Sequence, residues 1–274
     1  MIPIFMCGNR NTTDGILLCA LSIAKTTRRE IKLFVGTMNL TDINPEFKEL
    51  RECDLKSAEE VLKKANPNSS VTIINLEENF RRELINSKNI KTAYTPYAMI
   101  RLFADECAVL PDKLIYLDTD VLLAKDIGLF YDIDINDYDL AGSLDYYGKV
   151  FINPRYLNSG VMLWNLKRIR ENGIFRRAVT MCNNRKMLLM DQSAINKCAR
   201  RKLILPSKFN EQHKKKKDTV IQHFSMRIRW FPFIKTEKIK PWNFELLHKK
   251  LKLFDYDDII EEFKLIKQGE CARE

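Results

Sequence analysis

The chain has 274 residues, of which 45% are hydrophobic and 30% charged, with nine glycines and nine prolines; this length and composition indicate one large globular domain, or one domain with a small appendage, and exclude a disordered chain. The formal net charge of +10 is compatible with a solvated basic surface, an anionic membrane, a polyanionic ligand or nucleic acid, because charge alone does not separate these. The most apolar stretch, at 16–24, is too short for the ~20 residues that a membrane span needs.

Seven cysteines are scattered along the chain without a CxxC pair. An odd number without that spacing argues against a disulfide framework or a structural zinc site and favours reduced thiols. The N-terminus lacks the long apolar run of a signal peptide. We therefore expect a soluble, cytoplasmic protein.

Apolar runs in the first half of the chain predict strands that are separated by helices. The expected strands lie at 2–7, 31–38, 71–76 and 113–118. A helix is expected over 15–27, with Asp14 as its candidate N-cap. A charged helical pattern extends to about Ala65, and a further helix over 97–110 is expected to end before Pro111.

The second half continues this alternation. Further strands are expected at 139–144, 156–166, 203–206 and 219–225, and helices at 167–183 and 191–200. The segment after 225 is basic, aromatic and less periodic. Near-continuous apolar strands that alternate with helices predict a largely parallel sheet covered on both faces. Ligands of such sheets bind beyond the carboxyl ends of the strands.

The strand expected at 113–118 ends in a pair of carboxylates, Asp118 and Asp120, on either side of Thr119. Residues i and i+2 of an extended segment point to the same side, so both side chains can share one cation. Their oxygen atoms suit Mg²⁺ or Mn²⁺; a pair of N-caps or a turn is the structural alternative. The chain contains neither GxxxxGK[ST] nor GxGxxG, so a bound nucleotide would need the metal and basic residues to hold its phosphates.

The stretch LPDKLIYLDTDVLLAKDIGLFYDIDI, at 110–135, resembles the family-eight glycosyltransferases. These are retaining enzymes that include glycogenin and bacterial lipopolysaccharide galactosyl- and glucosyltransferases. The resemblance runs over nearly the whole chain in the order of the family. The other matching motifs are IPIFMCGNRN at 2–11, YAMIRLFADECAVLP at 97–111, AGSLDYY at 141–147, YLNSGVMLWNL at 156–166, MDQSAIN at 190–196, LPSKFN at 205–210, VIQHFS at 220–225 and KPW at 240–242.

The resemblance implies an α/β fold of the Rossmann-like GT-A type, a three-layer sandwich with a basic C-terminal extension. Residues 1–225 would form the nucleotide-sugar-binding catalytic domain, and 226–274 would complete its site. A UDP-hexose, UDP-glucose or UDP-galactose, is the implied donor, and the acceptor would be a glycan or a lipid-linked molecule. The implied cofactor is Mn²⁺, with Mg²⁺ as the alternative.

For the metal, the resemblance assigns Asp118, Asp120 and His223 as ligands, a mixed oxygen and imidazole set that favours Mn²⁺. Without the motif, His223 would be interpreted as an ordinary strand histidine. Lys240 of KPW matches a family lysine at the diphosphate, and a surface lysine is its alternative. Negative charge develops on the leaving oxygen, and a divalent ion together with a lysine offsets it.

The resemblance also assigns residues around the donor sugar. The catalytic candidates are Asp145, Asn158, Asp191 and Gln192. Asp191 and Gln192 are the ones nearest the β-face, and retention could come from a covalent intermediate or from same-face attack. A helix cap is the alternative for Asp191.

Six further residues are expected to contact the nucleotide sugar: Asn9, Asn11, Arg101, Thr119, Ser159 and Gly160. Arg101 could equally be a buried ion-pair partner, and Ser159 and Gly160 would let the backbone approach the sugar closely. Family members commonly carry acidic residues after the first strand, where uracil and ribose bind, whereas this chain has Asn9, Arg10 and Asn11. Asparagine can still hydrogen-bond uracil in both directions.

A second departure from the family pattern is the basic and aromatic segment 227–238. It replaces a short glycine-bearing link and is expected to line the acceptor side or to pack the tail over the donor site. The C-terminal Lys/Arg clusters, with Trp230, Phe231 and Phe233, predict a peripheral contact with anionic lipid at the inner face of the membrane.

Two other functions explain parts of the sequence. A sugar-phosphate nucleotidyltransferase also combines an α/β sheet with metal-binding aspartates, but it needs a glycine-rich basic loop after the first strand, and MCGNRNTTDG at 6–15 lacks that spacing. A nucleic-acid binder would use the net charge but would leave Asp118, Asp120 and Asp145 unexplained. We therefore expect no nucleic-acid partner.

Overall fold

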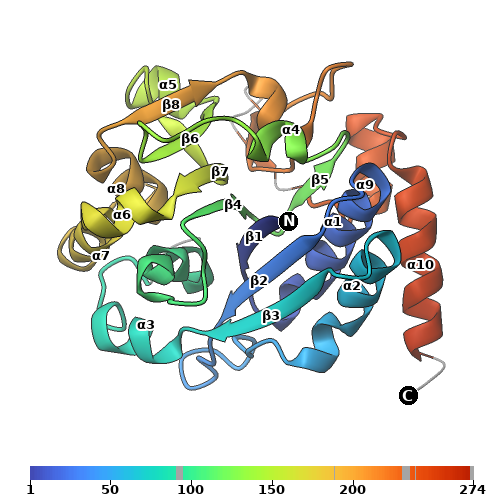
Figure 1. Cartoon of the computed structure of the whole chain (residues 1–274), viewed down its shortest axis with the longest axis horizontal. Coiled ribbons are helices and arrows are strands. Elements are labelled where there is room, and N and C mark those ends of the chain that lie inside the picture. The colour runs from blue at the N-terminus through green and yellow to red at the C-terminus, as the bar shows by residue number, and fades with distance from the viewer. Residues whose placement is uncertain (91–94, 188, 230–234, 238, 272–274) are drawn as a thin grey trace.

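The computed structural model describes residues 1–90, 95–187, 189–229, 235–237 and 239–271. Its centre is a seven-stranded sheet with the order β3-β2-β1-β4-β7-β6-β8 (Figure 1). The strands are β1 (Ile2–Cys7), β2 (Ile31–Thr37), β3 (Ser70–Asn75), β4 (Lys113–Leu117), β6 (Leu140–Leu144), β7 (Leu157–Asn165) and β8 (Lys202–Leu205). Within this sheet β7 alone runs antiparallel to its neighbours. The predicted α/β class with a largely parallel sheet is confirmed.

Strand β1 shows why the sheet is covered on both faces. All six of its residues are buried. Ile2, Ile4 and Met6 belong to the hydrophobic core on one face, and Phe5 and Cys7 belong to the core on the other. Successive side chains of a strand point to opposite faces, so a strand that is apolar at every position needs a layer on each side.

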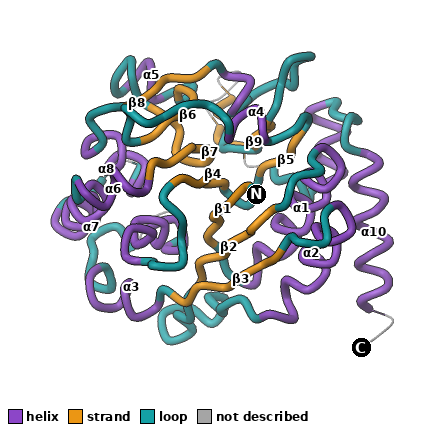
Figure 2. The backbone as a smooth tube through the Cα atoms, in the orientation of Figure 1, coloured by secondary structure: helices purple, strands orange, loops and turns teal. Residues whose placement is uncertain are grey.

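Helices form the two outer layers, as the tube view shows (Figure 2). One face is covered by α1 (Thr13–Thr26), α2 (Glu52–Ala65) and α10 (Asp257–Cys271). The other is covered by α3 (Glu77–Glu83), the 3₁₀ helix η2 (Pro96–Glu106), α6 (Leu166–Glu171), α7 (Ile174–Asn184) and α8 (Met190–Cys198). Shorter helical turns are η1 (Arg10–Thr12), α4 (Gly128–Tyr131), α5 (Gly148–Phe151), η3 (Ser207–Phe209), α9 (Phe244–Leu246) and the π-helical turn η4 (Leu247–Leu251).

Two pairs of short antiparallel strands lie outside the main sheet. β5 (Val121–Leu123) pairs with β9 (Ile221–His223), and β10 (Arg227–Arg229) pairs with β11 (Lys235–Glu237). The strand expected at 219–225 is therefore shorter than predicted. The expected lipid-contacting residues Trp230, Phe231 and Phe233 lie outside the described residues.

Three predicted helices differ from the observed ones. Helix α1 begins at Thr13, so Asp14 lies in its first turn instead of capping it. The helix expected over 97–110 is of the 3₁₀ type and already ends at Glu106. The helix expected over 167–183 is two helices, α6 and α7, because Gly173 between them has a left-handed φ of 56°, a conformation that interrupts an α-helix.

The C-terminal segment contains a helix that the sequence pattern did not predict. Helix α10 buries Ile259, Ile260 and Phe263 in the core that also contains the buried face of α1. None of the described helices combines the length and the apolarity that crossing a bilayer would require.

Candidate active site

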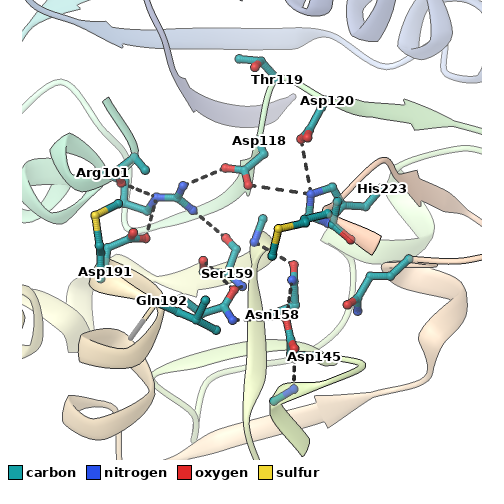
Figure 3. Close-up of a pocket in the computed structure, with 18 of the residues that line it drawn as sticks. Arg101, Asp118, Thr119, Asp120, Asp145, Asn158, Ser159, Asp191, Gln192 and His223 are labelled. Carbon is teal, nitrogen blue, oxygen red and sulfur yellow. Dashed lines mark hydrogen bonds and ion pairs between the residues drawn. The ribbon is translucent and has the colours of Figure 1, made fainter. Parts of the chain in front are cut away.

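A cavity of about 590 Å³ opens beyond the carboxyl ends of the central strands (Figure 3). Asp118 follows directly after β4, and His223 is the last residue of β9. Strand β5 begins one residue after Asp120, and its pairing with β9 sets Val121 opposite His223. The backbone N–H of Phe224 also donates to the carbonyl of Asp120 at 2.9 Å. This short antiparallel pair therefore brings a distant histidine to the two carboxylates.

Asp118, Asp120 and His223 form a compact triad. The Nε2 atom of His223 lies 3.3 Å from Oδ1 of Asp120 and 3.8 Å from Oδ2 of Asp118. Each residue offers one ligand atom, and these atoms all lie within 4.8 Å of one another. Two carboxylate oxygens and one imidazole nitrogen are a donor set suited to Mn²⁺, so the residues present fit the predicted metal.

Gly160 on β7 has no side chain and so leaves room for the side chains of the triad. A Cβ atom at this position would lie 2.3 Å from Cε1 of His223 and 2.6 Å from Oδ2 of Asp118. Glycine is therefore required for the approach of these side chains, in addition to the role toward the sugar that the sequence suggested. Gly15 on α1 has a similar role, because a Cβ there would lie 2.3 Å from the carbonyl oxygen of Thr119 and 2.7 Å from Trp242.

Arg101 connects several groups of the cavity wall. Its side chain is 4% exposed. The guanidinium donates to Oδ1 of Asp118 at 2.8 Å and to the carbonyl of Ser159 at 2.9 Å, and its Nε lies 3.2 Å from Oδ2 of Asp191. It also stacks over the ring of Tyr116, with Cζ 4.2 Å from the ring centroid. Arg101 is thus a buried ion-pair partner and a cavity residue at once.

Two buried carboxylates of the cavity wall, those of Asp191 and Asp120, have opposite pKa shifts. Burial raises the pKa of Asp191 to about 6, although the positive charge of Arg101 acts in the other direction. Burial would also raise the pKa of Asp120, but the neighbouring Lys240 and His223 overcome this effect and hold it well below its usual range. Lys240, whose ammonium contacts Oδ2 of Asp120, lines the cavity with Trp242.

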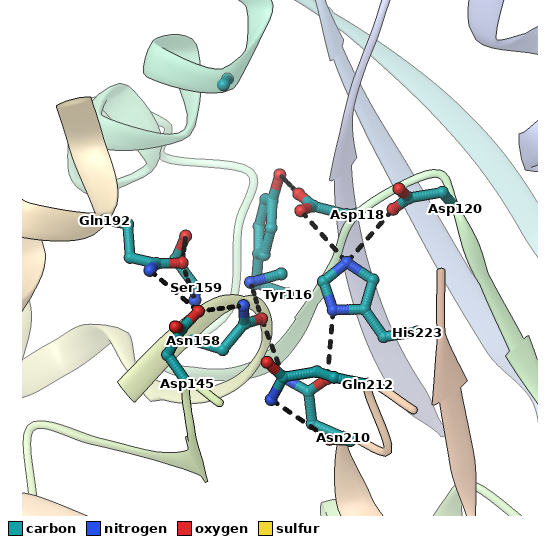
Figure 4. A network of polar contacts seen from close by, with 12 residues as sticks. Tyr116, Asp118, Asp120, Asp145, Asn158, Ser159, Gln192, Asn210, Gln212 and His223 are labelled. Carbon is teal, nitrogen blue, oxygen red and sulfur yellow. Dashed lines mark hydrogen bonds and ion pairs between the residues drawn. The ribbon is translucent and has the colours of Figure 1, made fainter. Parts of the chain in front are cut away.

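A second polar network leads from the triad to the opposite wall (Figure 4). Nδ1 of His223 lies 3.1 Å from Oδ1 of Asn210, and Nδ2 of Asn210 donates to Oδ1 of Asn158 at 2.9 Å. Nδ2 of Asn158 donates to Asp145 at 2.9 Å, and Gln192 donates to the same carboxylate oxygen at 3.2 Å. Two predicted sugar-binding side chains, those of Asn158 and Gln192, therefore converge on the carboxylate of a third, Asp145.

The loop after β1 is placed differently from the other predicted residues. Gly8 and Thr12 of this loop line the cavity, whereas the side chains of Asn9 and Asn11 donate to the carbonyl of Glu46, at 3.2 and 3.4 Å. The remaining predicted site residues all line the cavity. They are Arg101, Asp118, Thr119, Asp120, Asp145, Asn158, Ser159, Gly160, Asp191, Gln192, His223 and Lys240.

Sequence reasoning did not single out several residues that build the site. Gln212 and His213 line the cavity, and Gln212 donates to the carbonyl of Leu144 at 2.9 Å. Asn210 belongs to the motif LPSKFN and Trp242 to the motif KPW, so the family motifs already contained both residues. The two residues act through packing and through other side chains, which a motif alone does not show.

The sheet and its cavity define the fold of a GT-A type glycosyltransferase. A solved structure of the galactosyltransferase LgtC, in complex with donor and acceptor sugar analogs, matches with a TM-score of 0.68 at 19% identity, covering 96% of this chain and 95% of that one. A second solved structure, of an active-site mutant of LgtC, matches with a TM-score of 0.69 at 18% identity, covering 95% and 94% of the two chains.

The family follows from the sequence comparison. The model of glycosyl transferase family 8 matches residues 3–245, and the chain belongs to this family. A probable glycosyl transferase, Gly, of Streptococcus gordonii is 30% identical over 110 residues, 39% of this chain and 16% of that protein. General stress protein A of Bacillus subtilis is 27% identical over 195 residues, 66% of this chain and 63% of that protein. The chain thus matches less than two-thirds of the length of each of these relatives.

Proposed function

We propose that the chain is a retaining hexosyltransferase that moves glucose or galactose from UDP to a glycan or lipid-linked acceptor. The observation that carries this proposal is the triad of Asp118, Asp120 and His223 in the wall of a cavity. A cavity of about 590 Å³ is in the usual range for small-molecule sites.

The triad would hold Mn²⁺, with Mg²⁺ as the alternative. When bound, the ion would act as a Lewis acid that offsets the negative charge on the departing diphosphate. Lys240 lies against Asp120 and supplies a positive charge at the same place. The uracil and ribose would lie against the loop after β1, where Gly8 and Thr12 line the cavity.

The donor sugar would lie between the triad and the network around Asp145. Asp145 also accepts from the backbone N–H of Gly148 at 2.6 Å, which holds its second oxygen, so the carboxylate is fixed before a ligand arrives. Oε1 of Gln192 accepts from the N–H and the hydroxyl of Ser159, at 2.9 and 3.2 Å. Fixed polar groups of this kind orient sugar hydroxyls at little entropic cost.

Asp191 and Gln192 are the proposed residues at the β-face. A covalent route would use a side chain as the nucleophile, whereas same-face attack would need only polar groups that stabilise the oxocarbenium-like sugar. Trapping of a glycosylated peptide after a short incubation with donor would support the first route. Retention without a trapped intermediate would support the second.

The segment 226–274 would complete the site, since Lys240 and Trp242 come from it and line the cavity. The proposed setting is cytoplasmic, with a peripheral contact at the inner face of an anionic membrane. Nucleic acid is not among the proposed partners.

A donor-hydrolysis screen tests the proposal. Purified protein with Mn²⁺ should release UDP from UDP-glucose or UDP-galactose, and Asp118→Ala should abolish release while the circular dichroism spectrum is kept. The control is Asp137→Ala, an exposed aspartate outside the cavity. Turnover that survives Asp118→Ala would contradict the proposal, and release of pyrophosphate from UTP and a sugar phosphate would indicate a nucleotidyltransferase instead.

A further inference from the structure

An exposed apolar surface lies at the mouth of the cavity. Every residue from 149 to 155 is exposed, and the exposed fractions are 69% for Val150, 67% for Phe151 and 40% for Ile152. Tyr146, just before this run, is 46% exposed. We refer to Tyr146 and 150–152 as the apolar rim. Contiguous exposed side chains of this size usually mark a surface that meets a partner.

The apolar rim is part of the cavity wall. Tyr146, Phe151 and Ile152 line the cavity, and the rim includes the last two residues of the short helix α5. Figure 1 shows α5 at the edge of the molecule, away from α10. A partner that covers the rim would therefore lie beside the opening through which an acceptor reaches the site.

The segment that carries the apolar rim is also positively charged. Residues 146–155 include Lys149 and Arg155 and no acidic residue. The ammonium of Lys149 lies 5.2 Å from the ring centroid of Tyr146, which keeps this charge next to the apolar side chains.

A second basic segment contacts the rim from the loop before β9. The ring of Tyr146 packs on that of His213, with the centroids 3.8 Å apart, and His213 begins the run HKKKK. Lys215 and Lys216 are paired with acidic side chains, while Lys214 and Lys217 are exposed. The surface next to the cavity thus combines protruding apolar tips with a basic border.

We propose that the apolar rim docks on an anionic lipid surface, with Val150 and Phe151 inserted among the acyl chains. The lysines would face the headgroups, since basic residues are attracted to anionic lipid and an aromatic ring such as that of Tyr146 suits the interface. A second copy of the chain fits less well because the same basic border would face itself, and nucleic acid offers no apolar medium for the tips. If the acceptor is lipid-linked, as the proposed function has it, it would then reach the cavity without leaving the membrane.

Vesicle flotation tests this docking surface. The full chain, without metal or nucleotide, is mixed with vesicles of phosphatidylglycerol and phosphatidylcholine in equal parts, and separately with phosphatidylcholine alone. The double variant V150S/F151S is compared with V109S/L265S, which removes two apolar side chains that are 55% and 68% exposed elsewhere. We expect the wild type to float with the mixed vesicles alone and V150S/F151S to bind them at least about tenfold more weakly, as the loss of buried apolar area requires. V109S/L265S should bind like the wild type.

Three results would overturn the docking surface. They are a wild type that stays in solution with mixed vesicles, a V150S/F151S variant that binds as tightly as the wild type, and equal weakening in both double variants. The result is separable from the proposed function, because flotation needs no turnover and hydrolysis of a soluble donor needs no vesicle.

Discussion

Asn210 requires a proton on Nδ1 of His223, the ring nitrogen that faces away from the two carboxylates. The N–H of Gly160 donates to Oδ1 of Asn158 at 3.0 Å, which turns the amide nitrogen of Asn158 to Asp145. Asn210 donates its own amide N–H to the same Oδ1 and so keeps only its oxygen for His223. Nδ1 of His223 must therefore be the donor to Asn210, and Nε2, the nitrogen that faces Asp118 and Asp120, is the one left to bind a cation.

This relationship predicts that Asn210 acts on metal affinity through His223. Asn210→Ala should weaken the binding of Mn²⁺ to the nucleotide-free protein by about 10- to 100-fold, the usual effect of losing a partner of a ligating histidine. Isothermal titration with Mn²⁺ measures it. Asn210→Asp keeps an acceptor for Nδ1 and should retain more affinity than Asn210→Ala. Equal affinity in the wild type and Asn210→Ala would show that the ring needs no such support.

Gly160→Ala should remove the proposed metal site while it leaves the fold in place. The added methyl group would overlap with His223 and Asp118, so one of the ligands has to move away. We expect a loss of Mn²⁺ affinity of roughly 100-fold or more, measured by electron paramagnetic resonance of the free ion. The matched control is Gly269→Ala on α10, where a Cβ meets no atom within 4 Å and should stabilise the helix by up to about 1 kcal/mol.

Lys240→Met should change the affinities for metal and for nucleotide in opposite directions. The ammonium of Lys240 contacts Asp120, and a positive charge at this place opposes a second cation. Its removal should tighten Mn²⁺ binding to the nucleotide-free protein by roughly three- to tenfold, in line with a partly exposed ion pair. The affinity for UDP in the presence of Mn²⁺ should instead fall, because the proposed contact of Lys240 with the diphosphate is lost.

The control for Lys240→Met is Lys56→Met, an exposed lysine on α2 outside the cavity, which should change neither affinity. Both titrations can be made by calorimetry on the same preparation. A fall of both affinities in Lys240→Met would mean that this lysine supports the site structurally instead of competing with the cation.

Asp191 should make the unfolding free energy depend on pH below neutrality. Its pKa is raised to about 6 in the folded chain, against about 3.9 for an unfolded aspartate. Between these values the folded state binds a proton that the unfolded state lacks, so the contribution of Asp191 is fully present below about pH 4 and is lost as the pH rises through about 6.

Urea unfolding of the metal-free wild type and of Asp191→Asn measures this contribution. Relative to Asp191→Asn, the wild type should lose about 2–3 kcal/mol of unfolding free energy between pH 4 and pH 7. The exposed Asp137→Asn should show no such shift. A difference that is constant over this range would mean that Asp191 titrates normally.

The strands could be predicted from apolar runs, and the candidate residues that line the cavity from the motifs of the family resemblance. A strand such as β1, which is apolar at every position, has few alternatives to the middle of a covered sheet, and the carboxylates after β4 follow from its direction. The helix α10 was missed although Ile259, Ile260 and Phe263 recur at helical spacing, because charged residues between them hide the pattern. The break at Gly173 depends on a left-handed φ that composition does not reveal.

Other features of the site depend on tertiary contacts that no local pattern contains. That Asn9 and Asn11 turn to the carbonyl of Glu46 depends on a loop distant in sequence. The need for glycine at 160 arises from His223, which reaches that place through the pairing of β9 with β5. The hydrogen-bond direction at Asn210 likewise requires the whole network from Gly160 to Asp145.

The pairing of β5 with β9 has a consequence for the nascent chain. The carboxylates of Asp118 and Asp120 leave the ribosome long before the imidazole of His223, and Lys240 and Trp242 follow later still. Until then, Asp120 has neither its imidazole partner nor the ammonium of Lys240. Under the proposed function, a product that stops before residue 242 should therefore be inert toward donor.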